Sequence, residues 1–321
     1  MQFKEKIIEL RSTIEKTLAP LIGDKCILAD APYYNNIGDI LIWQGIEDFL
    51  RHNNKSLISV TNINTFLFPE ISEDITILLM GGGNFGDLYR CFQDFRLKVI
   101  KKYSKNRIIM FPQSIWYEDI SIIERDARIF SQHNDLYLCA RDKWSYDFLS
   151  KYFNANNILL VPDMAFCIDD KILESYRRSG TRKKLFLKRL DKELSKSTPH
   201  ITNAECDIFD WPSFEKKIYQ IFFLQKLLSI RMKLKLSEKL HICIGKCIDI
   251  YANRYLKKSL VKLGCKFLAP YSLIMTTRLH ALILSVLLYK DVKYIDNITS
   301  KLSAFSDTWL KDLNNIKPYE G

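Results

Sequence analysis

Glycine and proline are scarce in this chain, with 11 Gly and 9 Pro among 321 residues. This composition excludes long disordered or low-complexity stretches, and the hydrophobic share of 47% is that of a globular protein. Long apolar runs are also missing: the longest, residues 281–289, is under half of the ~20 residues that a membrane span needs. We therefore expect a globular protein that is soluble or lies at a membrane surface.

Patterns of metal ligands and of paired cysteines are missing as well. Cys243 and Cys247 are the one close pair among 8 Cys, no second pair matches them, and His241 is not at zinc-finger spacing. The N-terminus begins a charged amphipathic helix instead of an apolar signal segment. These features predict no metal site and reduced thiols in the cytoplasm.

Basic residues outnumber acidic residues in this chain. The chain has 37 Asp and Glu against 48 Lys and Arg, which gives a formal charge of +11 and a pI near 9.1. A basic protein favours an anionic partner, although charge alone does not distinguish nucleic acid, anionic lipid and small phosphates.

Short apolar runs alternate with amphipathic helical patterns between residue 25 and about residue 163. Runs that are buried on both faces and separated by helices are typical of a parallel, doubly wound sheet. The expected strands are residues 26–29, 57–60, 75–80, 107–111, 136–139 and 158–161.

The chain length predicts two domains of roughly 150 residues each, with a cleft between them. A basic stretch at 177–196 interrupts the pattern around an apolar segment, 185–187, that suits a strand. We place a Rossmann-like lobe at 1–165 and a smaller α/β lobe at 166–321. In the second lobe we expect helices at 214–234, 248–263 and 278–288, strands at 273–276 and 292–295, and a last helix to about residue 313.

Polar loops follow the predicted strands of the first lobe. In an open parallel sheet, ligands gather at the loops that leave the carboxyl ends of the strands. Those loops are residues 35–39, 81–87, 112–114, 141–142 and 162–163, and we expect them to open on one face.

The glycine segment 81–86 satisfies the pattern G-x-G-x-x-G, which alone would suggest a dinucleotide site. It follows the third predicted strand instead of the first, and no acidic residue ends the next strand, so NAD binding is disfavoured. Two readings stay open: a loop that offers backbone N–H groups to an anion at a helix N-terminus, and a tight turn that binds nothing.

Arg278 and His280 stand where a predicted strand ends and an apolar helix begins. A guanidinium there can hold a carboxylate or phosphate, and a histidine can donate a proton near neutral pH. A capping arginine beside a packed histidine is an equally good reading of this pair alone. The remaining histidines lie in contexts that favour no catalytic role: His52, His133, His200 and His241.

The charge run at 177–196 favours a solvated face over a specific site. If it binds a ligand, an anionic membrane surface or a lipid diphosphate would suit it.

Taken together, these motifs resemble the polysaccharide pyruvyl transferase family, in the family's order and over nearly the whole chain. No single motif decides the resemblance; the ordered combination does. The set is Asn36-Ile37-Gly38-Asp39, Gly81-Gly82-Gly83-Asn84, Pro112-Gln113-Ser114, Arg141-Asp142-Lys143-Trp144-Ser145, Pro162-Asp163, Thr277-Arg278-Leu279-His280, Asp296-Asn297 and Lys301-Leu302-Ser303.

The resemblance implies two Rossmann-like lobes arranged as in GT-B glycosyltransferases, with phosphoenolpyruvate as donor and no metal or cofactor. It implies a sugar or lipid-linked oligosaccharide as acceptor, no nucleic-acid partner, and pyruvate ketal formation in exopolysaccharide, capsule or O-antigen synthesis. The protein would act in the cytoplasm, with peripheral contact at the inner face of the membrane as a further expectation.

The same resemblance guides the assignment of site residues. Ketal formation needs an acid and a base, for which we assign His280 and Asp39, with Asp163 as the second candidate for the base. The expected donor-binding residues are Arg141, Arg278, Gln113, Ser114 and Lys301. The expected acceptor-binding residues are Asn36, Gly38, Gly82, Gly83, Asn84 and Asp163.

Two other functions stay open from the residues alone. The first is a GT-B-type glycosyltransferase that uses a nucleotide sugar, because anion-binding loops would serve a diphosphate equally well. The second is a non-catalytic basic scaffold at the membrane, which would leave Arg278 and His280 without a shared task.

Overall fold

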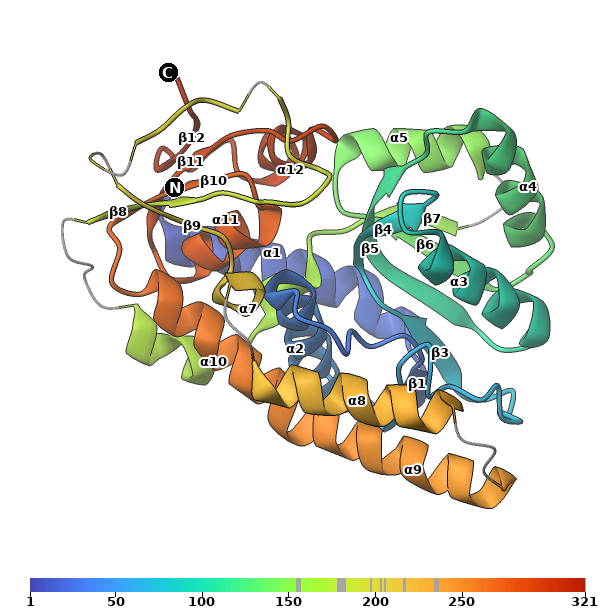
Figure 1. Ribbon diagram of the computed structural model, residues 1–321. Helices are drawn as coiled ribbons and strands as arrows, with labels where there is room; N and C mark the ends of the chain where they lie inside the picture. Colours follow the sequence, from blue (N-terminus) through green and yellow to red (C-terminus); the bar gives the residue numbers. More distant parts are fainter. Residues whose placement is uncertain are drawn as a thin grey trace.

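The computed structural model describes residues 1–153, 157–177, 183–196, 198–202, 204, 206–215, 218–233 and 237–320. The chain forms a mixed α/β structure around two parallel sheets (Figure 1). The prediction of a parallel α/β architecture is therefore confirmed.

The first sheet has 7 strands in the order β2-β1-β3-β5-β6-β7, with β4 beside β5. All six strands predicted for the first lobe are present. The order reverses between β1 and β3, and such a switch point leaves a crevice at the carboxyl ends of the strands. The bounds are β1 Lys25–Leu28, β2 Ser56–Val60, β3 Thr76–Leu79, β4 Gly82–Gly86, β5 Ile108–Trp116, β6 Leu136–Ala140 and β7 Asn157–Leu160.

The second sheet has 5 strands in the order β12-β11-β10-β8-β9. Its order reverses between β8 and β10, as the first sheet's order does between β1 and β3. The prediction covered β8, β10 and β11 and missed two short strands, β9 and β12. The bounds are β8 Lys184–Leu187, β9 Asp207–Phe209, β10 Leu273–Thr276, β11 Asp291–Tyr294 and β12 Ile316–Pro318.

Helices cover both sheets and connect them. The α-helices are α1 Phe3–Leu18, α2 Ile37–His52, α3 Arg90–Lys102, α4 Ile120–Ser131, α5 Lys143–Tyr152, α6 Asp170–Leu173, α7 Pro212–Glu215, α8 Tyr219–Lys233, α9 Glu238–Tyr251, α10 Lys257–Leu268, α11 Leu279–Leu287 and α12 Lys301–Trp309. Short 3-10 helices occur at η1 Ala19–Leu21, η2 Met164–Cys167 and η3 Glu174–Tyr176, and a π-helical turn, η4 Ala252–Leu256, joins α9 to α10.

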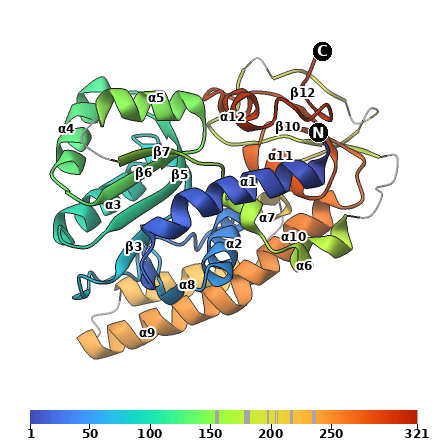
Figure 2. The same cartoon turned by 180° about the vertical axis from the view of Figure 1, so that it is seen from behind.

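The two halves of the chain pack against each other along a shared core. Helix α1 crosses the back of the molecule (Figure 2) and contacts both η2 and α11. Every residue of α11 is buried, because this helix lies between the second sheet and α2. One cluster of buried apolar side chains therefore includes residues from both halves. The domain boundary at residue 165 stays a prediction.

The glycine segment differs from the loop that the sequence predicts. Residues 82–86 form strand β4, which pairs in parallel with the extended end of β5, and the next helix, α3, begins only at Arg90. Gly86 has φ +113°, and a Cβ there would lie 1.8 Å from the carbonyl oxygen of Trp116. The segment is thus held against β5, and it does not lead directly into a helix N-terminus.

Helices α8 and α9 lie side by side and extend along one end of the molecule (Figure 1). Within the described residues, no helix combines the length and the apolar character that crossing a bilayer requires.

Candidate active site

A cavity of about 430 Å³ lies where the carboxyl ends of the two sheets meet. Strand β4 and the segments that follow β1, β4 and β6 line one side, and the segments that follow β8, β9, β10 and β11 line the other. The lining consists of Tyr34, Asn35, Asn36, Asp39, Gly83, Asn84, Tyr89, Phe92, Arg141, Arg189, Asp191, Glu193, Trp211, Phe214, Arg278, Leu279, His280, Asn297 and Lys301. Each sheet contributes its switch point to this cavity, which is the expected place for a ligand.

The first turn of α2 presents a carboxylate to the cavity. Asn36 caps the helix by accepting a hydrogen bond from the amide of Gly38 at 3.0 Å. Its side-chain amide and the hydroxyl of Tyr34 both donate to Oδ2 of Asp39, each at 2.8 Å. Burial and the charge of Asp39 raise the pKa of Tyr34 well above its ordinary value, so the phenol stays a donor. The Asp39 carboxylate is therefore fixed in one orientation.

Two glycines allow cationic or aromatic groups to approach closely. A Cβ on Gly83 would stand 3.0 Å from Nζ of Lys301 and 3.2 Å from Nη2 of Arg141. A Cβ on Gly38 would stand 2.5 Å from Nδ1 of His280. A Cβ on Gly38 would therefore displace His280, because real Cβ atoms do not come within 3.0 Å of other atoms, whereas a Cβ on Gly83 would crowd the ends of the two long side chains.

A buried cluster joins the two halves beneath the cavity. Oδ2 of Asp163 lies 2.9 Å from Nη1 of Arg141 and 3.3 Å from Nε2 of His280. Burial alone raises the pKa of Asp163, but His280 and Arg141 outweigh that effect and lower the pKa to about 2. A permanently charged carboxylate therefore holds an arginine from one half and a histidine from the other.

Arg141 is almost completely buried, yet part of its guanidinium is available. Nε donates to Ser114 at 2.8 Å, and Ser114 in turn donates to Asp142 at 2.8 Å. Within the described part of the chain, Nη2 has no hydrogen-bond acceptor. This nitrogen lies beside Gly83 in the wall of the cavity and can hold an anion.

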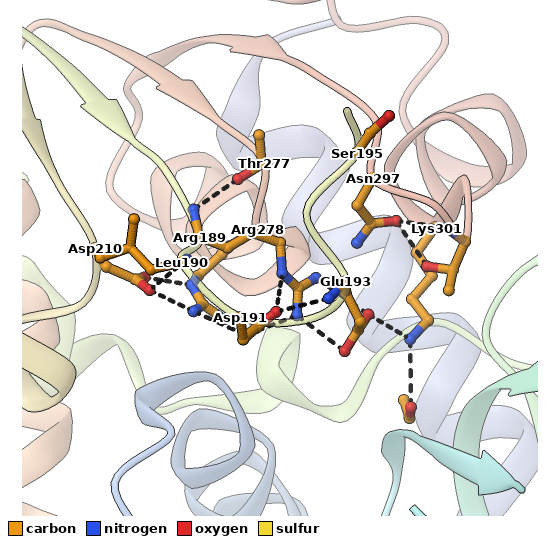
Figure 3. A network of polar contacts seen from close by, with 12 residues as sticks. Arg189, Leu190, Asp191, Glu193, Ser195, Asp210, Thr277, Arg278, Asn297 and Lys301 are labelled. Carbon is orange, nitrogen blue, oxygen red and sulfur yellow. Dashed lines mark hydrogen bonds and ion pairs between the residues drawn. The ribbon is translucent and has the colours of Figure 1, made fainter. Parts of the chain in front are cut away.

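The second half contributes a network of ion pairs (Figure 3). Arg278 donates to both carboxylate oxygens of Asp210 and, at 3.2 Å, to Asp191. Arg189 contacts Asp191 at 2.8 Å and Glu193 at 2.9 Å. These carboxylates fix the two guanidiniums in place, with Asp191 shared between them.

Lys301 extends the network to the first half. Its Nζ donates to Glu193 at 3.1 Å and to the carbonyl oxygen of Gly83 at 3.3 Å. Burial lowers the pKa of Lys301, against the opposing effect of Glu193. Burial raises the pKa of Glu193, but Lys301 and Arg189 outweigh it and the pKa falls below its ordinary value.

Arg278 also keeps one nitrogen available. Among the residues that the structure describes, none accepts a hydrogen bond from its Nη1, and the guanidinium lies 4.8 Å from the ring centre of Phe214. Arg141 and Arg278 thus offer one guanidinium nitrogen each, from the first and the second sheet respectively. Two such groups suit a ligand that carries two anionic ends.

The structure brings together most of the residues that the sequence singled out. Those that line the cavity are Asn36, Asp39, Gly83, Asn84, Arg141, Arg278, His280 and Lys301. Those placed behind the lining are Gly38, Gly82, Gln113, Ser114 and Asp163. Gln113 is buried in β5 and donates to the carbonyl of Met80, and Ser114 supports Arg141. The division into donor and acceptor sides stays a prediction.

Several cavity residues were missed by the sequence reasoning. Arg189, which belongs to the charge run read as a solvated face, is buried beside Asp191 and Glu193, so that reading is wrong at this position. Residues 178–182 of the run lie outside the described residues. One signal was available: residues 188–193 follow a predicted strand, where ligands gather in parallel sheets.

Groups of at least 3 His, Cys, Asp or Glu that could hold a metal ion are not found among the described residues.

Comparison with known proteins identifies the family to which this chain belongs. A model of the family described as polysaccharide pyruvyl transferase matches residues 36–290, which include all the site residues above except Tyr34, Asn35, Asn297 and Lys301. The chain belongs to the polysaccharide pyruvyl transferase family.

Relatives support this membership over the full chain. The chain is 31% identical over 322 residues to EpsO of Bacillus subtilis, whose name marks it as a candidate pyruvyl transferase, with 99% of this chain and 95% of that protein covered. It is 25% identical to Pyruvyl transferase 1 of Schizosaccharomyces pombe, covering 89% of this chain and 70% of that protein.

A solved structure shows the same fold. The crystal structure of an uncharacterized protein from Klebsiella pneumoniae superposes with a TM-score of 0.66 at 19% identity, covering 97% of this chain and 99% of that chain.

Proposed function

We propose that the protein transfers pyruvate from phosphoenolpyruvate to a pair of sugar hydroxyls, forming a cyclic ketal in surface polysaccharide synthesis. Membership in the family supports a transferase acting on a polysaccharide precursor. The observation that carries the donor assignment is the pair of available guanidinium nitrogens, on Arg141 and Arg278, in one cavity. Phosphoenolpyruvate has a carboxylate at one end and a phosphate at the other, which matches that pair.

The cavity surrounds this donor with further cationic and polar groups. Lys301 and Arg189 lie beside the two guanidiniums, although each is ion-paired with Glu193. The carboxylates offset the mutual repulsion of these cations. A bound phosphate would take over part of this role, and fixed donors of this kind stabilise charge that develops during reaction without further reorganisation.

The reaction needs one proton on carbon and a path for two hydroxyl protons. A proton adds to the methylene carbon of phosphoenolpyruvate, and one sugar hydroxyl adds to the resulting cationic carbon while losing its own proton. The bond between this carbon and the bridging oxygen of the phosphate then breaks, and inorganic phosphate leaves. The second hydroxyl adds to the same carbon, loses its proton and closes the ketal. Overall, two hydroxyl protons are given up, one proton stays in the new methyl group, and phosphate takes the other.

His280 is the acid in this proposal. Asp163 faces Nε2 of the imidazole, which leaves Nδ1, beside Gly38, to carry the proton that is transferred. Asp163 then acts as a positioning residue that stabilises the imidazolium, and Asp39, held by Tyr34 and Asn36, takes the hydroxyl proton as the base.

We assign the segments 36–39 and 82–84 to the acceptor, and the two sheets to a GT-B-like pair of lobes with the cavity between them. No metal or cofactor takes part, and the enzyme acts in the cytoplasm on a sugar or lipid-linked oligosaccharide.

Isothermal calorimetry tests the donor assignment. We expect phosphoenolpyruvate to bind, and Arg141→Lys to weaken its affinity ~10-fold or more, because lysine keeps the charge but lacks the fork geometry, and a lost hydrogen bond to a charged group costs at least ~1.5 kcal/mol. Lys143→Gln, which removes an exposed cation two residues away, is the matched control and should bind normally. Tighter binding of a nucleotide sugar than of phosphoenolpyruvate would indicate a glycosyltransferase, and normal binding by Arg141→Lys would exclude Arg141 as a donor ligand.

A further inference from the structure

Helices α8 and α9 expose several large apolar side chains. Tyr219, Phe222 and Phe223 are 76%, 48% and 49% exposed. We call the whole set the hairpin surface; its members are Tyr219, Phe222, Phe223, Ile230 and Met232 on α8, Leu240, Ile242 and Ile250 on α9, and Tyr255 on η4.

These side chains are not the edge of a core. Helix α8 already buries an apolar stripe that includes Ile221 and Leu224, so it is apolar on both its inner and its outer face. A helix of this kind needs a second apolar environment besides its own core. The ring of Phe223 lies 5.5 Å from that of Tyr251, which lies 5.5 Å from that of Tyr255, so aromatic contacts run continuously from α8 to η4.

The same segment carries most of the net charge of the chain. Residues 218–262 contain ten Lys and Arg against two acidic residues, a net +8 of the chain's +11. The exposed cations next to the hairpin surface include Lys226, Arg254 and Lys258. Exposed aromatic and aliphatic side chains among Lys and Arg are the composition that binds helices flat on anionic bilayers.

The pair of helices is held rigidly against the first half of the molecule. Arg231 donates to the carbonyl oxygen of Asn64 at 2.6 Å, and Asp249 accepts from Tyr33 at 2.9 Å and from Thr65 at 2.6 Å. The hairpin surface therefore has a fixed orientation relative to the cavity. Phe214, which lines the cavity, precedes the first residue of α8 by only five positions.

We propose that the hairpin surface docks the protein on an anionic lipid bilayer, with its aromatic side chains in the interface and its lysines and arginines on the lipid phosphates. Since no described helix can cross the bilayer, the hairpin lies on the membrane. Within the charge run at 177–196, Arg177 pairs with Asp170 and Arg189 belongs to the cavity network, so these two cations already have partners in the protein. On the proposed function, docking through α8, which begins five residues after Phe214 of the cavity, would hold the enzyme at the membrane that carries a lipid-linked acceptor.

Vesicle co-sedimentation of the full chain tests the proposal. The probe is vesicles of phosphatidylcholine alone and of phosphatidylcholine with an equal part of phosphatidylglycerol. We expect binding to the anionic vesicles that falls steeply with salt, and a loss of about fivefold in the partition coefficient for each of Lys226→Gln, Arg254→Gln and Lys258→Gln. The double variant Phe222→Ser, Phe223→Ser should also weaken binding while the cations are intact.

A matched control removes an exposed apolar residue and a cation elsewhere. Ile120, on α4, is 70% exposed and Lys105 is exposed beside Glu73, so Ile120→Ser with Lys105→Gln should bind like the wild type. Thermal melts confirm that each variant folds. The proposal is overturned if the wild type ignores anionic vesicles or if hairpin variants bind as well as the control. It is equally overturned if sedimentation shows that the hairpin surface joins two copies of the chain, or if the protein binds a soluble polyanion and no vesicle.

Discussion

Close packing around His280 shows how single residues determine the site. The imidazole is fixed from below by Asp163 and lies against Gly38 at the start of α2. Since α2 belongs to the first half and α11 to the second, the absence of a side chain at residue 38 is what allows the proposed acid and base to share one cavity.

Replacing Gly38 by alanine should therefore misplace the proposed acid. The added methyl would stand 2.5 Å from Nδ1 and 2.9 Å from Cβ of His280, so the ring must move. A displacement on the order of 1 Å at a catalytic group can cost ~10²-fold in rate, so we expect kcat to fall about that much while phosphoenolpyruvate still binds. Steady-state kinetics and calorimetry measure the two effects. An unchanged kcat in a folded Gly38→Ala variant would remove His280 from the proton transfer.

Several of these residues could be recognised from the sequence because they occupy the loops after buried strands. Asp39, Arg141 and His280 follow apolar runs or begin an apolar helix, so the position of the site was predictable. Arg189 also follows a predicted strand, but its burial was not predictable, because it depends on Asp191, Glu193 and the hydroxyl of Thr277, and local charge density suggests an exposed segment.

At the scale of elements, the strands were predicted well where they are buried on both faces. Residues 75–80 form a continuous apolar run, and β3 lies there. Strand β4 escaped prediction because three of its five residues are glycine, which has no intrinsic preference for strands, and pairing with β5 overrides this. The packing of α8 against α9 could not be predicted either, because α8 is apolar on more than one face and its sequence does not show which face packs against another helix.

The attachment of α9 predicts a pH-dependent stability. Asp249 on α9 is mostly buried against Tyr33 and Thr65, and burial raises its pKa from 3.8 to about 6. The folded protein therefore holds this proton more tightly than the unfolded chain. The stability that protonated Asp249 provides is complete below about pH 4 and is lost as the pH rises through about 6.

Asp249→Asn should remove this loss of folding stability at high pH, because the amide keeps an oxygen for Tyr33 and Thr65 and carries no charge. At pH 8 we expect Asp249→Asn to raise the free energy of unfolding by roughly 1 to 2 kcal/mol, a value reduced from the full pKa shift because Asp249 is partly exposed. The difference from the wild type should shrink toward pH 4. Asp249→Ala, which removes the acceptor as well, should destabilise the protein across this range. Equal melting temperatures of wild type and Asp249→Asn at pH 8 would contradict the account.

At the scale of the whole molecule, two sheets with the same kind of order reversal share one cavity. Each supplies one available guanidinium nitrogen, on Arg141 and Arg278, and the buried Asp163 links Arg141 to His280 across the halves. The arrangement explains why the site residues are scattered from residue 34 to residue 301 in the sequence. Phe214, in the wall of this cavity, is five positions before the start of α8, which carries part of the hairpin surface.

We propose that this cavity moves pyruvate from phosphoenolpyruvate to a sugar diol. The most direct measurement incubates the full chain with phosphoenolpyruvate isotopically labelled at C2 and a panel of saccharide acceptors, and follows inorganic phosphate together with the labelled carbon by NMR. We expect one phosphate released for each new ketal carbon, only with an acceptor present, and ~10²-fold slower transfer by His280→Gln and Asp39→Asn. Unchanged phosphoenolpyruvate with every acceptor, together with nucleotide release from a nucleotide sugar, would contradict the account.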